Sequence, residues 1–191
     1  MEELPKTTKP IVKVLDSDNP EAIQLEYDVF LDSGYIKPNT DNVVSEYASF
    51  THSWFVAIEQ SGQLMGVSRI IPAACLKDGW RQLPTNIHFS LNKQIIAYFD
   101  SLENSHFFEV GTMAIRKSYR GGSVFRLLWK GVYHQAIQHN CHYGLSSIDA
   151  DFYKILLQIG LPMESIGKPK YYMGSETVPV LIKIKEIVLP T

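Results

Sequence analysis

Residues 107–128 of the chain read FFEVGTMAIRKSYRGGSVFRLL. The stretch from Phe107 to Ile115 carries apolar residues on both alternating faces, which is typical of a strand at the centre of a sheet. A tight polar turn over 116–122 follows, and from Val124 the apolar residues recur with helical period. The segment therefore predicts a central strand that passes through a basic, glycine-containing turn directly into a helix.

The rest of the chain predicts further strands and helices around this segment. Strands are expected over 11–15, 54–58, 64–71 and 143–148, helices over 20–31, 91–102 and 149–159, and a closing hairpin over 171–188. The order β-α-β-β-α-β-α-β-α-β-β favours one α/β domain of the mixed α+β type over residues 1–191, with residues 1–10 as a flexible arm. Residues 73–90 read as irregular, and residues 35–51 as a long polar loop suited to a lid or a substrate-facing segment.

Composition excludes several classes of protein. The 191 residues carry a formal net charge of −2, which provides no basic field for nucleic acid. Cys75 and Cys141 share no metal-type spacing and predict no disulfide framework, so a reducing cytoplasm is expected. The first ten residues contain no apolar segment typical of a signal peptide, and no apolar run is long enough to span a membrane. The six histidines show no ligand spacing, so no metal is expected.

Three features of the deciding segment point to chemistry. Glu109 is a carboxylate inside an apolar strand, and it needs a cation or hydrogen-bond donors if it is buried. Gly111 stands two residues later, where a bulge could expose a backbone N–H group. The turn and helix start, with Arg116, Lys117 and Arg120, form a natural anion cradle. Each feature has an ordinary structural explanation, but their adjacency favours a functional one.

The turn from Tyr119 to Phe125 (YRGGSVF) resembles the acyl-donor loop of the GNAT acyltransferase superfamily, whose pattern is Arg/Gln-x-x-Gly-x-Gly/Ala. The resemblance implies a GNAT-like acyl-CoA N-acyltransferase fold, in which helices flank a central mixed β-sheet. Ser123 and Phe125 depart from the pattern, because a bulky Phe would crowd the diphosphate of coenzyme A that glycines admit. This departure argues against an ordinary acetyl-CoA-dependent enzyme.

A narrower resemblance covers roughly residues 22–186. Residues 67–72 (VSRIIP), 108–115 (FEVGTMAI), 156–169 (LLQIGLPMESIGKP) and 174–184 resemble strands, a helix with its turn and the final hairpin of the acyl-homoserine-lactone (autoinducer) synthases. Residues 25–30 (LEYDVF) and 34–36 (GYI) resemble the related long-chain N-acyl amino acid synthases.

This chain differs from the autoinducer synthases at residues of the part of their site that binds adenosylmethionine. Those enzymes carry an Arg where this chain has Thr112, and their early helix supplies an Arg where this chain has Glu26 and Asp28. Their paired acidic motif is not recognisable around residues 46–49. Homoserine-lactone synthesis is therefore not expected, whereas acyl transfer to another amine is compatible with these losses.

The resemblance implies roles for individual residues. Glu109 would accept the proton of the attacking amine as general base, directly or through a water. Arg69, expected to face Glu109 from the neighbouring strand, would orient it or bind a substrate carboxylate. Tyr153 lies on the helix where GNAT enzymes often place a general-acid Tyr. Backbone N–H groups near Gly111 would polarise the thioester carbonyl. The residues expected to hold the acyl thioester are Gly111, Thr112, Met113, Ala114, Arg116, Arg120, Gly121, Gly122, Ser123 and Val124.

The expected donor is an acyl carrier protein, as the resemblance implies. Its phosphopantetheine arm carries a single phosphate, which the altered loop can bind more easily than the several phosphates of coenzyme A. The positive patch for this acidic partner would comprise Arg116, Lys117, Arg120, Arg126 and Lys130, although a solvated helix face explains the last two slightly better. The aromatic residues that could wall an acyl tunnel, or simply fill the core, are Phe89, Phe99, Phe107, Trp129 and Tyr153.

The sequence thus predicts an N-acyltransferase that moves a fatty acyl group, expected to be long, from an acyl thioester to the amine of an amino acid or similar small molecule. Two alternatives stay open at this point. One is an acetyl-CoA-dependent GNAT acetyltransferase. The other is an inactive protein of the same fold that binds an acyl group or a partner, which the Thr112 departure favours mildly.

Overall fold

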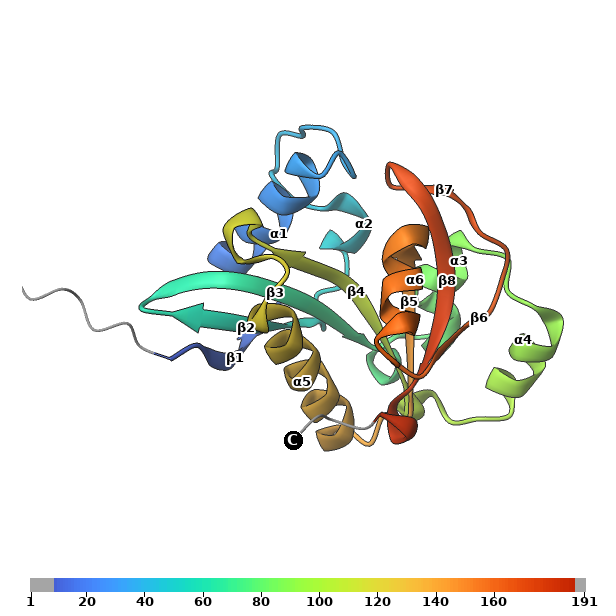
Figure 1. Ribbon diagram of the computed structural model, residues 1–191. Coiled ribbons are helices and arrows are strands. Elements are labelled where there is room, and N and C mark those ends of the chain that lie inside the picture. The colour runs from blue at the N-terminus through green and yellow to red at the C-terminus, as the bar shows by residue number, and fades with distance from the viewer. Residues whose placement is uncertain (1–8, 188–191) are drawn as a thin grey trace, which may run out of the picture.

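The computed structural model describes residues 9–187, and a single eight-stranded sheet organises them (Figure 1). Its strands are β1 (Ile11–Asp16), β2 (Trp54–Gln60), β3 (Gln63–Pro72), β4 (Phe107–Ile115), β5 (Tyr143–Asp149), β6 (Met163–Ser165), β7 (Lys170–Tyr172) and β8 (Ser175–Lys183). Their order is β1-β2-β3-β4-β5-β8-β6, and β7 pairs with β8. Only β4 and β5 run parallel among these pairs, so the sheet is mixed, as the sequence predicts.

Six α-helices accompany the sheet in the described part of the chain. They are α1 (Pro20–Asp32), α2 (Ser45–Ala48), α3 (Pro84–His88), α4 (Lys93–Asp100), α5 (Ser123–Gln138) and α6 (Ala150–Gln158). Figure 1 shows α1 and α5 on opposite sides of the β2–β3–β4 part of the sheet. The alternation of β2 explains this arrangement, since Phe55 and Ala57 pack towards α1 whereas Val56 and Ile58 pack towards α5.

The parallel pair β4–β5 is short and then diverges. Phe107, Phe108 and Glu109 pair with Tyr143, Gly144 and Leu145, and no later residue of the two strands pairs. The two strands therefore separate at Val110 and Ser146, where the Ser146 hydroxyl donates to the Val110 carbonyl at 2.8 Å. Residues of both strands beyond this point, among them Gly111 and Ser147, line a pocket.

A bulge in β4 lies at the same level. Arg69 of β3 pairs with Thr112 and Ile70 pairs with Val110, so Gly111 has no counterpart. Glycine is required there because an added Cβ would lie 2.9 Å from a ring carbon of Tyr47. The bulge that the sequence predicts at Gly111 is thus confirmed.

Most predicted elements are confirmed, and the errors fall in the segments without periodicity. Asn19 caps α1 by accepting from the Ala22 N–H at 3.0 Å, as its position before Pro20 predicts. The long loop over 35–51 contains α2, and the irregular stretch over 73–90 contains α3, since isolated turns of helix leave no hydrophobic period to detect. The final turn lies at Met173–Gly174, and the chain leaves the strand after Lys183. Residues 1–8 of the predicted arm, and Val188, lie outside the described residues.

Candidate active site

The divergence of β4 and β5 opens a pocket of about 170 Å³ with two unlike walls. The wall on the α5–α6 side is apolar and consists of Val110, Met113, Phe125, Trp129, Ile148, Phe152, Leu156 and Ile182. The wall on the α1–α2 side carries hydroxyls and one carboxylate and consists of Phe30, Tyr35, Tyr47, Ser147, Asp149, Tyr172, Met173, Ser175 and Thr177. Gly111, Thr112 and Ser146 complete the lining between the walls.

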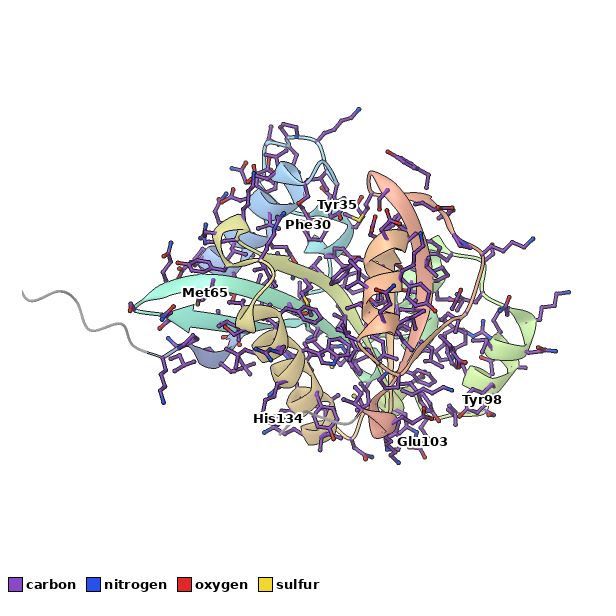
Figure 2. The ribbon with its side chains drawn as sticks, viewed as in Figure 1. Phe30, Tyr35, Met65, Tyr98, Glu103 and His134 are labelled. Carbon is purple, nitrogen blue, oxygen red and sulfur yellow. The ribbon has the colours of Figure 1, made fainter. Side chains whose placement is uncertain are left out.

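The end of α1 and the β7–β8 hairpin both contribute to the lining of the pocket. Figure 2 shows Phe30 and Tyr35 on the side of α1 that faces this hairpin. The hairpin turn touches the chain beside Tyr35, because a Cβ added to Gly174 would lie 2.4 Å from the Gly34 carbonyl oxygen. Gly174 also has a positive φ of 80°. Glycine is therefore favoured here both by the close approach and by the backbone conformation.

Glu109 lies in β4 next to the pocket and is fully buried. Its carboxylate accepts the Thr85 backbone N–H at 2.9 Å and the Thr85 hydroxyl at 2.9 Å. Burial raises the pKa of Glu109 to about 8, although both Thr85 hydrogen bonds oppose the rise. Within residues 9–187 no cation pairs with this carboxylate, so Glu109 holds its proton more tightly than an ordinary Glu and titrates near neutral pH.

The Thr85 hydroxyl links Glu109 to the pocket. It lies 2.9 Å from the Ser147 hydroxyl, and Ser147 lines the polar wall. Since Thr85 donates to Glu109, the Ser147 hydroxyl is the donor to Thr85 in this arrangement, and its own oxygen can still accept a hydrogen bond. Glu109, Thr85 and Ser147 therefore form a continuous chain of hydrogen bonds, which we call the proton chain. The sequence did not indicate Thr85, because it lies in the stretch without periodicity.

Arg69 does not face Glu109, and the predicted contact between them is wrong. Arg69 makes a bidentate ion pair with Glu26 of α1, with Nε–Oε1 at 3.0 Å and Nη2–Oε2 at 2.7 Å, and donates from Nη1 to Ser53 at 3.1 Å. The Thr112 hydroxyl donates to the same Glu26 carboxylate. The strand register explains the error, because Arg69 pairs with Thr112 whereas Glu109 pairs with Ile71. Every nitrogen of the guanidinium is engaged, so Arg69 supports the fold beneath the pocket.

The residues predicted to hold the acyl thioester separate into three groups. Gly111, Thr112 and Met113 line the pocket, whereas Ala114 and Val124 are buried in the core. The turn residues lie at the start of α5: Gly121 has a positive φ of 76°, Gly122 occupies the cap position without a side-chain cap, and Ser123 begins the helix. The first N–H groups of α5 thus meet no capping side chain.

The two arginines of the turn are anchored to backbone carbonyls. Arg116 donates to the Leu64 carbonyl at 2.9 Å, and Arg120 donates to the Ile115 carbonyl at 3.0 Å and to the Ser33 hydroxyl at 3.3 Å. They line a second hollow together with Lys117 and two carboxylates of α1, Asp28 and Asp32. The three cations and two carboxylates leave this hollow with a formal charge of +1.

The predicted tyrosine and tunnel aromatics agree only partly with the pocket. Tyr153 packs against the core beside α5 and α6 and does not line the pocket. It is therefore not placed with the other predicted site residues that do. Of the proposed tunnel residues, Trp129 lines the pocket, whereas Phe89, Phe99 and Phe107 form a separate core beside α3 and α4. Phe125, expected to crowd the diphosphate of coenzyme A, lines the apolar wall in an edge-to-face contact with Phe152, with 5.9 Å between ring centres. Among residues 9–187 no cluster of three metal-binding side chains occurs.

The chain is similar to known acyltransferases in sequence and in structure. The N-acyl amino acid synthase FeeM family matches residues 21–184. An acyl-homoserine-lactone synthase of Vibrio anguillarum is 23% identical over 181 residues, which are 90% of this chain and 88% of that protein. The structure of FeeM, an N-acyl amino acid synthase from uncultured soil microbes, has a TM-score of 0.72 over 93% of this chain and 92% of that one, at 16% identity. The CoA-dependent acyl-homoserine lactone synthase BjaI, solved with SAM and isopentyl-CoA, has a TM-score of 0.72 over 93% and 85%, at 10% identity.

The fold, with a mixed sheet that divides between β4 and β5, is the one found in the solved acyl-homoserine-lactone and N-acyl amino acid synthases. The family match spans most of the chain, and the chain belongs to the N-acyl amino acid synthase FeeM family. It is therefore an acyltransferase, and its reaction is N-acyl transfer. Within the described residues no helix is both long and apolar enough to cross a membrane.

Proposed function

We propose that the chain transfers a fatty acyl group from an acyl carrier protein to the amine of an amino acid or similar small molecule. The observation that carries the proposal is the proton chain, which connects a fully buried carboxylate with a pKa of about 8 to a pocket with one apolar and one polar wall. Such a pKa lies near the operating pH, which is where general acid–base groups are most effective. The apolar wall suits an acyl chain, and the polar wall suits an amine.

The proton chain supplies the proton transfers that amide formation needs. The neutral amine attacks the thioester carbonyl, and its proton passes to Ser147 while Ser147 passes its own proton to Thr85 and Thr85 to Glu109. The new C–N bond forms, the C–S bond breaks, and the thiolate leaves. Protonated Glu109 then returns the proton through the same hydroxyls, because its pKa of about 8 is close to that of a thiol. An amine and a thioester thus yield an amide and a thiol, and Glu109 is regenerated.

The bulge at Gly111 would bind the thioester. The backbone from Gly111 to Met113 lines the pocket at the point where β4 leaves β5. N–H groups there would polarise the carbonyl as it becomes an oxyanion. The acyl chain would extend along Phe125, Trp129 and Leu156. Since a cavity of about 150 Å³ holds a molecule the size of benzene, a long chain requires the Phe125–Phe152 ring pair to separate.

The charge around the donor turn supports a carrier protein over coenzyme A. The hollow at Arg116, Lys117 and Arg120 also holds Asp28 and Asp32, and its formal charge of +1 suits the single phosphate of phosphopantetheine. Coenzyme A carries a diphosphate and a further phosphate, which need more cations. Calorimetric titration compares the donors: we expect measurable binding of acyl carrier protein and weak binding of coenzyme A. Tight binding of coenzyme A would contradict the carrier-protein donor.

Mass spectrometry of lipid extracts from cells that overproduce the chain tests the function itself. We expect N-acyl products whose amount falls strongly when Glu109→Gln is overproduced at the same level, because the amide side chain cannot accept the proton. The mass of the product identifies both the acyl length and the acceptor. If the wild-type chain produces no N-acyl compound, and purified protein acylates no amine from carrier protein or coenzyme A, the proposed function is wrong.

A further inference from the structure

Helix α6 carries a row of exposed apolar side chains. Phe152, Ile155 and Ile159 follow one another at spacings of three and four residues, so they lie on one side of the helix and its C-cap. They are 39%, 51% and 59% exposed. We call these three residues the α6 stripe. Contiguous exposed apolar side chains of this kind mark the binding site of an apolar ligand or partner.

The α6 stripe begins in the wall of the pocket. Phe152 lines the pocket and is also partly exposed, so one part of its ring meets the pocket and another meets the solvent. Leu156 is buried, lines the same apolar wall and lies on the adjoining side of the helix, four residues after Phe152. Phe125 of α5 meets Phe152 edge to face. Separation of these two rings would therefore join the apolar wall of the pocket to the stripe.

The charge of α6 favours a hydrocarbon as the occupant of the stripe. The helix contains two charged residues, Asp151 and Lys154, which pair with each other at 2.8 Å and leave it with no net charge. A hydrocarbon chain needs no charged partner and gains from covering apolar surface. An acidic carrier protein, in contrast, is attracted by a surface with an excess of cations.

The size of the pocket requires a second place for a long acyl chain. Its volume is about 170 Å³, and a cavity of about 150 Å³ holds one molecule of benzene. The distal carbons of a long chain must therefore lie outside the pocket. From Phe152 to Ile159 the helix rises by about 10 Å, at roughly 1.5 Å per residue. The stripe thus offers these carbons an apolar surface that starts where the pocket ends.

We infer that the α6 stripe binds the distal part of the acyl chain, which leaves the pocket between Phe125 and Phe152. This inference rests on the proposed function and assigns the preference for acyl length to Ile155 and Ile159. The first carbons of the chain fill the pocket, and the later methylenes cover the two isoleucines and leave water themselves. Complete burial of one methylene is worth about fourfold in affinity. A chain that stays half exposed on the stripe gains about twofold for each methylene.

A series of acyl lengths tests the inference. The wild-type chain and the double variant Ile155→Ser/Ile159→Ser are assayed with octanoyl, dodecanoyl and hexadecanoyl groups on carrier protein and on coenzyme A, with a mixture of the common amino acids as acceptors. We expect the ratio of kcat/KM for hexadecanoyl to that for octanoyl to fall about tenfold in the double variant, with either donor. Ile137→Ser is the control, since Ile137 of α5 is equally exposed and does not line the pocket. It should keep the wild-type ratio.

The other occupants of the stripe give different results. An unchanged ratio in the double variant, or an equal fall in Ile137→Ser, would overturn the inference and leave the proposed function standing. A loss that is equal for all lengths and occurs with carrier protein alone would assign the stripe to docking of that protein. Sedimentation of the wild-type chain, but not of the double variant, with phosphatidylcholine vesicles and at an unchanged ratio would assign it to a lipid surface. Both results would overturn the inference. If the wild-type chain transfers no acyl group of any length from either donor, the proposed function fails as well.

Discussion

Glu26 and Glu109 are two fully buried carboxylates on neighbouring elements, and their surroundings differ in one respect. Glu26 of α1 pairs with Arg69 and accepts the Thr112 hydroxyl, so its charge is balanced inside the protein. Glu109 of β4 accepts only uncharged donors from Thr85, and burial raises its pKa to about 8. The comparison indicates that a buried acid with a cation stabilises the fold, whereas a buried acid without one exchanges protons near neutral pH.

The largest expected effect concerns the stability cost of the charge on Glu109. Its folded pKa lies above its unfolded value of about 4.5, so the neutral form contributes stability that is complete below pH 4.5 and is lost as the pH rises through about 8. Relative to Glu109→Gln, the wild-type chain should lose on the order of 5 kcal/mol of unfolding free energy over this range. Urea denaturation at several pH values measures the difference. A constant difference between the two proteins would refute the raised pKa.

Arg69→Met tests the other buried carboxylate, Glu26, by removing the arginine with which it forms an ion pair. Glu26 would remain buried without a cation, and we expect the unfolding free energy to fall by about 4 kcal/mol. Chemical denaturation at pH 7 measures the loss. In the double variant with Glu26→Gln, much of this loss should be recovered because the unpaired charge is gone. A double variant no more stable than Arg69→Met would show that the ion pair is not the cause.

Thr85→Val removes the hydroxyl that donates to Glu109, and it should lower the unfolding free energy by less than Arg69→Met does. The backbone N–H of residue 85 remains, so we expect a loss of about 2 kcal/mol, and the pKa of Glu109 should rise further because a hydrogen bond that lowers it is missing. Acylation should fall as well, since the variant interrupts the proton chain. Thr85→Ser, which keeps the hydroxyl, is the matched control and should restore most of the activity.

Ser147→Ala should separate function from stability most clearly. The variant leaves both Thr85 hydrogen bonds to Glu109 intact, so we expect the unfolding free energy to change by less than about 0.5 kcal/mol. The rate of acylation should nevertheless fall about tenfold, because a water must replace the hydroxyl that connects the pocket to Thr85. A wild-type rate would mean that the proton leaves the amine by another path.

The strand–turn–helix unit was predictable because its signals are local. The apolar run on both faces of Phe107–Ile115 predicts a strand, and the turn at Gly121–Gly122 predicts a helix start, without any knowledge of their neighbours. Gly111 could be assigned to a bulge for the same reason, since a glycine inside a strand is itself the signal. The GNAT-like fold and the family followed from this unit together with shorter resemblances, and the comparisons confirm them.

The hydrogen-bond partners of Glu26 and Glu109 were not predictable from the sequence. They depend on the register between strands and on segments that show no hydrophobic periodicity. The one-residue offset at Gly111 places Arg69 opposite Thr112, and this pairing brings it to Glu26. Glu26 itself reads as a polar position of a helix, although it lies between the buried residues Leu25 and Tyr27. Thr85 follows Pro84 at the start of a five-residue helix, and only the folded chain brings that turn to Glu109.

The pH dependence of acylation tests the central claim, that Glu109 receives the amine proton through Thr85 and Ser147. In the wild-type chain, kcat/KM for one amine should rise with pH through an inflection near 8, where Glu109 loses its proton. The inflection should move to higher pH in Thr85→Val and be missing in the residual activity of Glu109→Gln, whereas ionisation of the amine itself affects all three alike. The same profile in all three proteins would contradict the account.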